Sequence, residues 1–145
     1  MATITASINI GSDISSYPIS ISKTMTMKKA GTIIGLDETL GLKTKKFTST
    51  TAAEIATAAD LTSDGAHKLY VRNASTDKSL FFYVAYNASA AAAATDQTIG
   101  KLYGGDWMLM PYNGSTDINV ASSSATETQY LEYMVFADGV VAAAG

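Results

Sequence analysis

The sequence predicts an all-β protein: a single β-sandwich, jelly-roll-like, with about eight strands. Three observations lead to this prediction: short segments in which apolar and polar residues alternate, turn residues between them at near-regular spacing, and scarcely any helical periodicity. Such brief strands, separated by Gly, Asn, Asp and Ser, are typical of sandwiches and barrels. Because 145 residues suffice for one core and are few for two, we expect one domain spanning residues 1–145.

The first two predicted strands lie near the N-terminus. Ile4, Ile8 and Ile10 alternate with Thr, Ser and Asn, which is the pattern of a half-buried strand. Turn residues fill positions 11–18, and a second alternation of apolar with Ser and Thr residues runs through 19–27. The sequence therefore predicts two strands here, each with one face on the core.

The next part of the chain has a weaker pattern. We expect a loop over residues 35–41 and an exposed strand over 42–47. Residues 50–60 are rich in alanine and would suit a short helix, yet Ile55 alone is a thin apolar face for one. A strand that leads into a turn at 60–65 is therefore favoured.

The second half of the chain is more regular. Strands are predicted over residues 68–72, 80–86, 98–103, 107–110, 117–121 and 129–136. The turn residues at 73–77, Gly104-Gly105 and Asn113-Gly114 predict that the strands on either side of each form a hairpin. The alanine tract at 88–94 predicts a loop with about one helical turn.

The composition excludes several classes of function. Charged residues make up 16% of the chain, against about 25% in typical soluble domains, so Thr, Ser and Asn must form much of the surface. A neutral surface does not repel neighbouring copies, so we expect the protein to be part of an assembly. The net charge of −3 and dispersed lysines give nucleic-acid binding no support. No signal peptide and no apolar stretch of roughly 18 residues is found, so we expect neither export nor a membrane span.

The residues needed for catalysis are scarce. The chain has no cysteine, which removes disulfides, thiolate catalysis and cysteine-based zinc sites. Its one histidine, His67, is expected at the surface where a strand begins. Glu132 could serve a glycosidase only with a second carboxylate across the sheet, and Trp107 and the tyrosines could stack on a sugar. We therefore expect no enzyme activity and no catalytic, metal or cofactor-binding residues, and keep carbohydrate binding as an alternative.

Four segments carry a resemblance to a known class of proteins. These are Lys68-Leu-Tyr-Val-Arg-Asn73, Ile99-Gly-Lys-Leu-Tyr-Gly-Gly-Asp-Trp-Met-Leu-Met-Pro-Tyr-Asn113, Asp117-Ile-Asn-Val120 and Glu132-Tyr-Met-Val-Phe136. Over residues 66–137 the chain resembles small β-sandwich virion structural proteins of tailed bacteriophages, including those of cyanophages and other marine phages. The likeness is one of strand and turn residues, not of a site motif.

The resemblance implies a structural role in the virion. The expected protein is a capsid decoration (cement) protein, made in the bacterial host cytoplasm without secretion, that stabilises the outer capsid surface. Its expected partners are the major capsid protein or other virion subunits, together with further copies of itself, for instance in a trimer. The alternative is a head-tail, tail-fibre or receptor-binding component with a carbohydrate-binding sandwich.

Subunit contacts are expected at both ends of the chain. An N-terminal arm (residues 1–17) could add a strand to the sheet edge of a neighbour, and the apolar tail (138–145) could form a second arm. The residues expected at the interface are Ile4, Ile8, Ile10, Tyr17, Trp107, Tyr112, Val140 and Val141.

Overall fold

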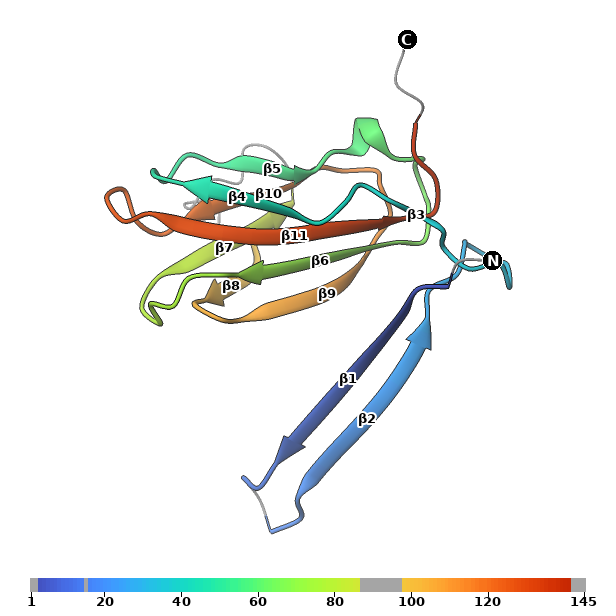
Figure 1. Ribbon diagram of the computed structural model, residues 1–145, viewed down its shortest axis with the longest axis horizontal. Coiled ribbons are helices and arrows are strands. Elements are labelled where there is room, and N and C mark those ends of the chain that lie inside the picture. Colours follow the sequence, from blue (N-terminus) through green and yellow to red (C-terminus); the bar gives the residue numbers. More distant parts are fainter. Residues whose placement is uncertain (1–2, 15, 87–97, 142–145) are drawn as a thin grey trace.

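Two antiparallel sheets packed together make the body of the molecule, and a separate hairpin projects from one end of it (Figure 1). The computed structural model describes residues 3–14, 16–86 and 98–141. Within these ranges the regular structure is β-strand, with a single 3-10 turn, η1 (Ala58–Asp60), and no α-helix. The prediction of an all-β sandwich is confirmed. The alanine tract at 88–94 lies outside the described residues.

Each sheet of the sandwich collects strands from distant parts of the chain. One sheet contains β3 (Glu38–Thr39), β4 (Lys43–Phe47), β6 (His67–Asn73), β9 (Trp107–Tyr112) and β11 (Gln129–Ala137). The other contains β5 (Ala53–Ala56), β7 (Phe81–Tyr86), β8 (Thr98–Tyr103) and β10 (Ile118–Ser122). The strands predicted over residues 42–47 and within 50–60 are therefore present, as β4 and β5.

The eight strands β4 to β11 pair in a nested order. The first pairs with the last (β4 with β11), β5 with β10, β6 with β9, and β7 with β8, all antiparallel. Strand β11 also pairs with β6 and β3, and β10 with β7, which completes the two sheets. Most consecutive strands therefore lie in opposite sheets.

The hairpins predicted at 73–77, Gly104-Gly105 and Asn113-Gly114 are wrong, because each of these turns crosses from one sheet to the other. The first two turns bond to each other: the Gly105 amide donates to the Asn73 carbonyl (2.9 Å) and the Gly104 amide to the Leu80 carbonyl (3.1 Å). A Cβ atom at Gly104 would collide with the Asp77 carbonyl. Gly104 thus permits the close approach of two crossing connections at one end of the sandwich.

Side chains from both sheets fill the space between them. Phe47 on β4 meets Phe82 on β7 edge to face, with 5.0 Å between ring centroids. The remaining fully buried apolar side chains of this core include Leu69, Val71, Val84, Ile118, Val120, Leu131 and Val135. Alternating residues of each strand supply them, as two inner sheet faces require.

Small polar side chains organise the turns. In many of them a Ser, Thr, Asn or Asp oxygen accepts a hydrogen bond from the backbone amide two residues later. Examples are Ser12 with Ile14, Thr39 with Gly41, Asn73 with Ser75, Asp77 with Ser79, and Asn113 with Ser115. The Thr, Ser and Asn content therefore satisfies turn backbone as well as forming the surface.

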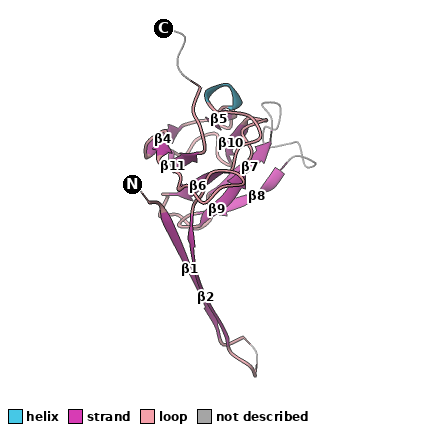
Figure 2. Cartoon of the chain, turned by 90° about the vertical axis from the view of Figure 1, so that its right-hand side faces the viewer, coloured by secondary structure: helices cyan, strands magenta, loops and turns pink. Residues whose placement is uncertain are grey.

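The hairpin of β1 (Thr5–Ser12) and β2 (Ile19–Thr26) stands apart from the sandwich, and we call it the arm (Figure 2). Its strands pair only with each other among the described strands. Every residue of β2 and most of β1 are exposed, so the prediction of two half-buried strands is wrong in its burial. Both strands alternate apolar and polar residues as predicted, but no described residues of the chain cover the apolar face.

Candidate interaction surface

Strand pairing sorts the arm into one apolar and one polar face. Residues paired across a hairpin point to the same side, and successive pairs alternate between sides. On one side are the pairs Ala6 and Met25, Ile8 and Lys23, Ile10 and Ile21, and Ser12 and Ile19. On the other are Thr5 and Thr26, Ser7 and Thr24, Asn9 and Ser22, and Gly11 and Ser20. Two matched alternations joined by turn residues could have predicted this amphipathic hairpin from the sequence.

The apolar face of the arm is open to solvent. Its large side chains are each 40–45% exposed: Ile8, Ile10, Ile19, Ile21 and Met25. At the tip Ile14 is 84% exposed and Tyr17 is 86% exposed. Of the predicted interface residues, Ile8, Ile10 and Tyr17 therefore lie on one element, while Ile4 is half-buried at its base.

A groove of about 520 Å³ separates the arm from the edge strand β9. Its arm wall includes Ala6, Ile8 and Met25, with Ser7, Lys23 and Thr24, and its sandwich wall is Trp107, Met108 and Leu109. Trp107, another predicted interface residue, is 53% exposed. Strand β9 ends its sheet, so its outer backbone edge has no strand beside it among the described residues.

The base of the arm is fixed to the sandwich. The Met27 amide donates to the Ile4 carbonyl and the Leu36 amide to the Met27 carbonyl, both at 2.9 Å, and Met27 and Leu36 are buried. The carboxylate of Asp138, just after β11, accepts from the amides of Ala30 and Ala66, each at 2.9 Å. Burial opposes ionisation of Asp138, but these two hydrogen bonds, followed by nearby positive charge, lower its pKa below the usual value.

His67 is buried beside this anchor, which corrects the expectation of a surface histidine. The Asp138 amide donates to its Nδ1 at 2.8 Å, and its Nε2 lies 2.8 Å from the Thr62 carbonyl. A carbonyl can only accept, so Nε2 carries the proton and Nδ1 accepts: both geometries require the neutral Nε2–H tautomer. His67 thus links the start of β6 to the segment after β11 and has no free nitrogen for catalysis.

The predicted C-terminal arm lies on its own sandwich as far as it is described. The Val141 amide donates to the Asp60 carbonyl (2.9 Å) and the Thr62 amide to the Gly139 carbonyl (3.0 Å). Val140 forms a bridge with Leu61, and its amide donates to a Glu38 carboxylate oxygen (3.0 Å). Residues 142–145 lie outside the described ranges. Val140 and Val141 remain exposed, on the body instead of on a free arm.

Tyr112, expected at the interface, is a core residue with 4% exposure. Its hydroxyl donates to the Thr116 carbonyl at 2.7 Å. Burial, followed by the charges of Asp117 and Tyr86, raises its pKa to about 12. The predicted strand ends at residue 110, whereas β9 continues through Pro111, on an edge that tolerates the proline, and so includes Tyr112.

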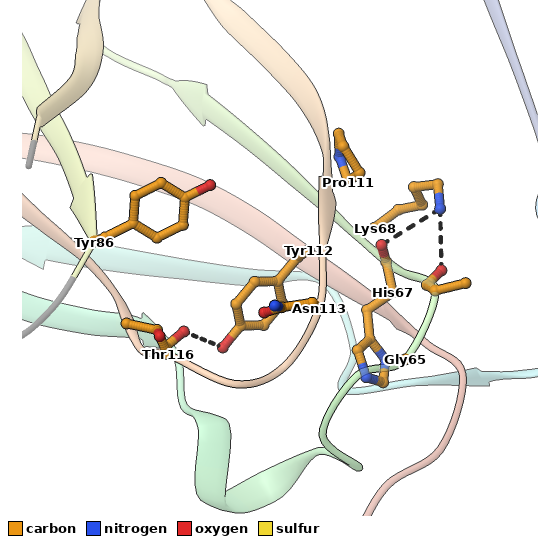
Figure 3. Close-up of a pocket in the computed structure, with 9 residues that line it drawn as sticks. Gly65, His67, Lys68, Tyr86, Pro111, Tyr112, Asn113 and Thr116 are labelled. Atoms are coloured by element: carbon orange, nitrogen blue, oxygen red, sulfur yellow. Dashed lines mark hydrogen bonds between the residues drawn. The ribbon is translucent and has the colours of Figure 1, made fainter. Parts of the chain in front are cut away.

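A second cavity of about 380 Å³ opens above Tyr112 (Figure 3). Its lining includes Tyr86, one of the tyrosines expected to be able to stack on a sugar, and Lys68 and Asn113, which the sequence did not single out for a site. The ring of Tyr86 is 43% exposed, while the Lys68 ammonium donates to the carbonyls of Ala66 and His67. The cavity therefore offers an aromatic ring beside an amide and an ammonium group.

The other catalytic candidate, Glu132, is engaged by a neighbour. The Tyr70 hydroxyl donates to its carboxylate at 2.8 Å, and burial together with this bond raises the pKa of Tyr70. Within the described ranges no group of three or more His, Asp or Glu side chains is placed to hold a metal ion. The same ranges contain no helix long and apolar enough to cross a bilayer.

No protein-family model matches the chain, and no match was found among curated proteins or among solved structures.

Proposed function

We propose that the protein is a structural subunit of a bacteriophage particle, a capsid decoration protein that holds to its neighbours through the arm. One observation carries the proposal: a hairpin projects from the sandwich, and the large side chains of its apolar face are exposed. Proteins that act by contact need such a surface, and the observed cavities hold no recognisable catalytic set.

The arm is the element of the structure that we expect to bind a partner. A lone two-stranded hairpin is at best marginally stable in water, and large exposed apolar patches mark interaction sites. Fully burying an Ile or Met side chain stabilises by about 1.5–3 kcal/mol, so covering five that are less than half exposed contributes roughly 5 kcal/mol per arm. In a shell this contact is repeated by symmetry.

The winding of the sandwich also supports a virion role. Strands β4 to β11 form two sheets of four strands each. The first of these eight strands pairs with the last, the second with the last but one, and so on, which is the arrangement of a double Greek key. We infer a jelly roll, a fold found in viral capsid and lectin domains. The resemblance to tailed-phage virion proteins falls on β6 to β11, most of this sandwich.

The surface charge is compatible with close packing of copies. The chain carries 10 basic and 13 acidic residues, and among the described residues a single ion pair forms, between Lys29 and Asp37 at 3.2 Å. Neighbouring subunits therefore meet little electrostatic repulsion. This supports partners that are proteins of the same particle and gives no support to a nucleic-acid partner.

Binding to particles tests the proposal. Particles lacking the chain are mixed with the purified full-length protein, and bound copies are counted by quantitative mass spectrometry and located by cryo-electron microscopy. We expect saturable binding on the outer capsid surface in a number fixed by the lattice. A variant in which a short Gly-Ser linker replaces residues 5–26 should fold but lose this binding. Equal binding by both forms, or no binding by the wild type, would contradict the proposal.

The cavity with Tyr86 favours a second candidate, a receptor-binding component that recognises carbohydrate. An exposed aromatic ring beside polar groups can stack on a sugar while the polar groups bond to its hydroxyls. Glycan-array binding that is lost in Tyr86→Ala, with Trp107→Ala as the control for the exposed tryptophan outside the cavity, would support it. Binding to no glycan would remove this candidate.

A further inference from the structure

We propose that two copies of the chain exchange arms, so that each arm lies with its apolar face on the partner's arm and its side in the groove beside the partner's β9. This proposal rests on the proposed function and makes it more specific, because it identifies a second copy of the chain as the partner that the arm binds. The groove, the apolar area to be covered and the charges along the arm all support this exchange.

The groove and the arm match in chemistry. The groove has apolar side chains on both walls, Ile8 and Met25 from the arm and Trp107 and Leu109 from β9. An element that enters it must be slender and must present apolar side chains to the arm wall. The arm is a slender hairpin (Figure 1), and its strand register gives it one apolar face. Every copy carries both the projecting element and the groove. An exchange between two copies therefore covers both features in each.

The area points to a reciprocal pair. The five side chains of the apolar face at 40–45% exposure, Ile14 at 84% and Trp107 at 53% dominate the surface to be covered. If a large side chain has an accessible area of about 200 Å², these residues expose roughly 700 Å² per copy, close to the ~800 Å² per partner of a standard interface. One arm in one groove would cover only about half of this area. Two exchanged arms together bury an area of the size found in stable interfaces.

The single apolar face fixes the number of copies. Face-to-face packing is mutual: the arm that covers a second arm is covered by it, and no apolar face remains for a third copy. On the opposite face, Asn9, Ser20 and Ser22 lie outside the residues that line the groove and stay in water. The Ser7 and Thr24 hydroxyls already bond to each other across that face at 2.8 Å. The pair therefore closes as a two-fold dimer.

Charges along the arm favour an antiparallel arrangement. Lys23 is the one charged residue in the two arm strands and lines the groove in the base half of the arm, whereas Asp13 is exposed at the tip. When two arms lie antiparallel, the tip of each approaches the base half of the other. Asp13 of one copy then comes toward Lys23 of its partner.

The test is the oligomeric state of the full chain, measured by sedimentation velocity over a wide concentration range. Trp107 is the only tryptophan and lines the groove, so its fluorescence reports on the same contact. We expect a monomer–dimer equilibrium, with Trp107 emission moving to shorter wavelength as dimer forms. A chain that stays monomeric at every concentration, or that forms trimers, overturns the exchange.

Matched variants locate the contact on the apolar face. Ile10→Thr combined with Ile21→Thr alters one cross-strand pair that is already exposed in the monomer and keeps β-branched residues. Four isoleucines per dimer are lost, so the dissociation constant should rise at least ~100-fold. The control, Asn9→Thr with Ser22→Thr, alters the adjacent pair on the polar face and should dimerise like the wild type. Equal dimerisation of both variants overturns the proposal.

Different results would contradict the two proposals. A chain that remains monomeric yet binds particles through its arm overturns the exchange and leaves the decoration function standing. A chain whose arms exchange but which never binds particles overturns the function and leaves the dimer standing.

Discussion

At the scale of single residues, His67 and Asp138 show how distant parts of the chain are joined through backbone groups. Each residue takes part in hydrogen bonds with main-chain atoms of segments far away in the sequence, and they meet at the base of the arm. Sequence patterns could not predict this, because the Asp138 amide lies 71 positions from His67. Only the pairing of β6 with β11 brings the two together.

Asp138→Asn should destabilise the protein at neutral pH by about 1–2 kcal/mol, since two amides lose a charged acceptor. The pKa of Asp138 is lowered in the folded state from the usual 3.8. Its contribution is therefore complete above about pH 4 and is lost as the pH falls through the folded-state pKa. Urea unfolding at several pH values should show wild type and variant converging in acid. A difference that is independent of pH would contradict this role.

Tyr112→Phe removes the hydrogen bond to the Thr116 carbonyl and should lower the free energy of unfolding at pH 7 by about 1 kcal/mol. In the unfolded chain a tyrosine ionises near pH 10, whereas burial holds the folded pKa of Tyr112 at about 12. The wild type should therefore lose stability as the pH rises from 10 to 12, and the variant should lose less. Chemical denaturation at pH 7 and pH 11 measures both effects.

At the scale of elements, the strands could be predicted from the sequence but their partners could not. Alternation and turn residues located β1, β2 and β4 to β11 to within a few residues. A turn such as Asn113-Gly114 shows that the chain changes direction, but whether the next strand joins the same sheet depends on which apolar faces meet in the core. The uncovered face of the arm escaped prediction for the same reason: alternation shows two faces and not what covers them.

Substitutions in strand β4, which was expected to be exposed, test whether this strand contributes to the core. Phe47 is buried against Phe82, whereas its neighbour Lys46 is exposed. Phe47→Ala should lower the free energy of unfolding by about 3–5 kcal/mol through lost burial and the cavity left behind. Lys46→Ala, the matched control, should change it by less than about 0.5 kcal/mol. Thermal and urea unfolding compare the two, and equal effects would place β4 outside the core.

At the scale of the whole molecule, the low charge content and the projecting arm both support the proposal of a protein that acts by contact. The sequence alone shows that the chain has few charged residues. The projecting arm adds an exposed apolar surface, and a weakly charged protein can bring such a surface close to a neighbour without strong repulsion. The proposed interaction residues divide accordingly: Ile8, Ile10, Tyr17 and Trp107 are exposed on the arm or the groove wall, while Tyr112 belongs to the core.

Association of the full chain should depend only weakly on salt, because apolar side chains dominate the arm face and Lys23 and Asp13 are its few charges. Raising sodium chloride from low to molar concentration should change the dimer dissociation constant by less than about tenfold, and sulfate should strengthen association. Sedimentation at several salt concentrations provides the measurement. A steep loss of dimer with salt would mean that charged groups drive the contact.

The nested pairing of the sandwich has a consequence during protein synthesis. β11, the last of the described strands to leave the ribosome, lies between β4 and β6 in its sheet, so that sheet cannot close until residues 129–137 have emerged. The two strands of the arm are neighbours in sequence, so all the residues of its apolar face have emerged as soon as β2 leaves the ribosome. A nascent chain therefore exposes these apolar residues long before the sandwich can fold, and the proposed exchange of arms would bring neighbouring chains on one polysome together.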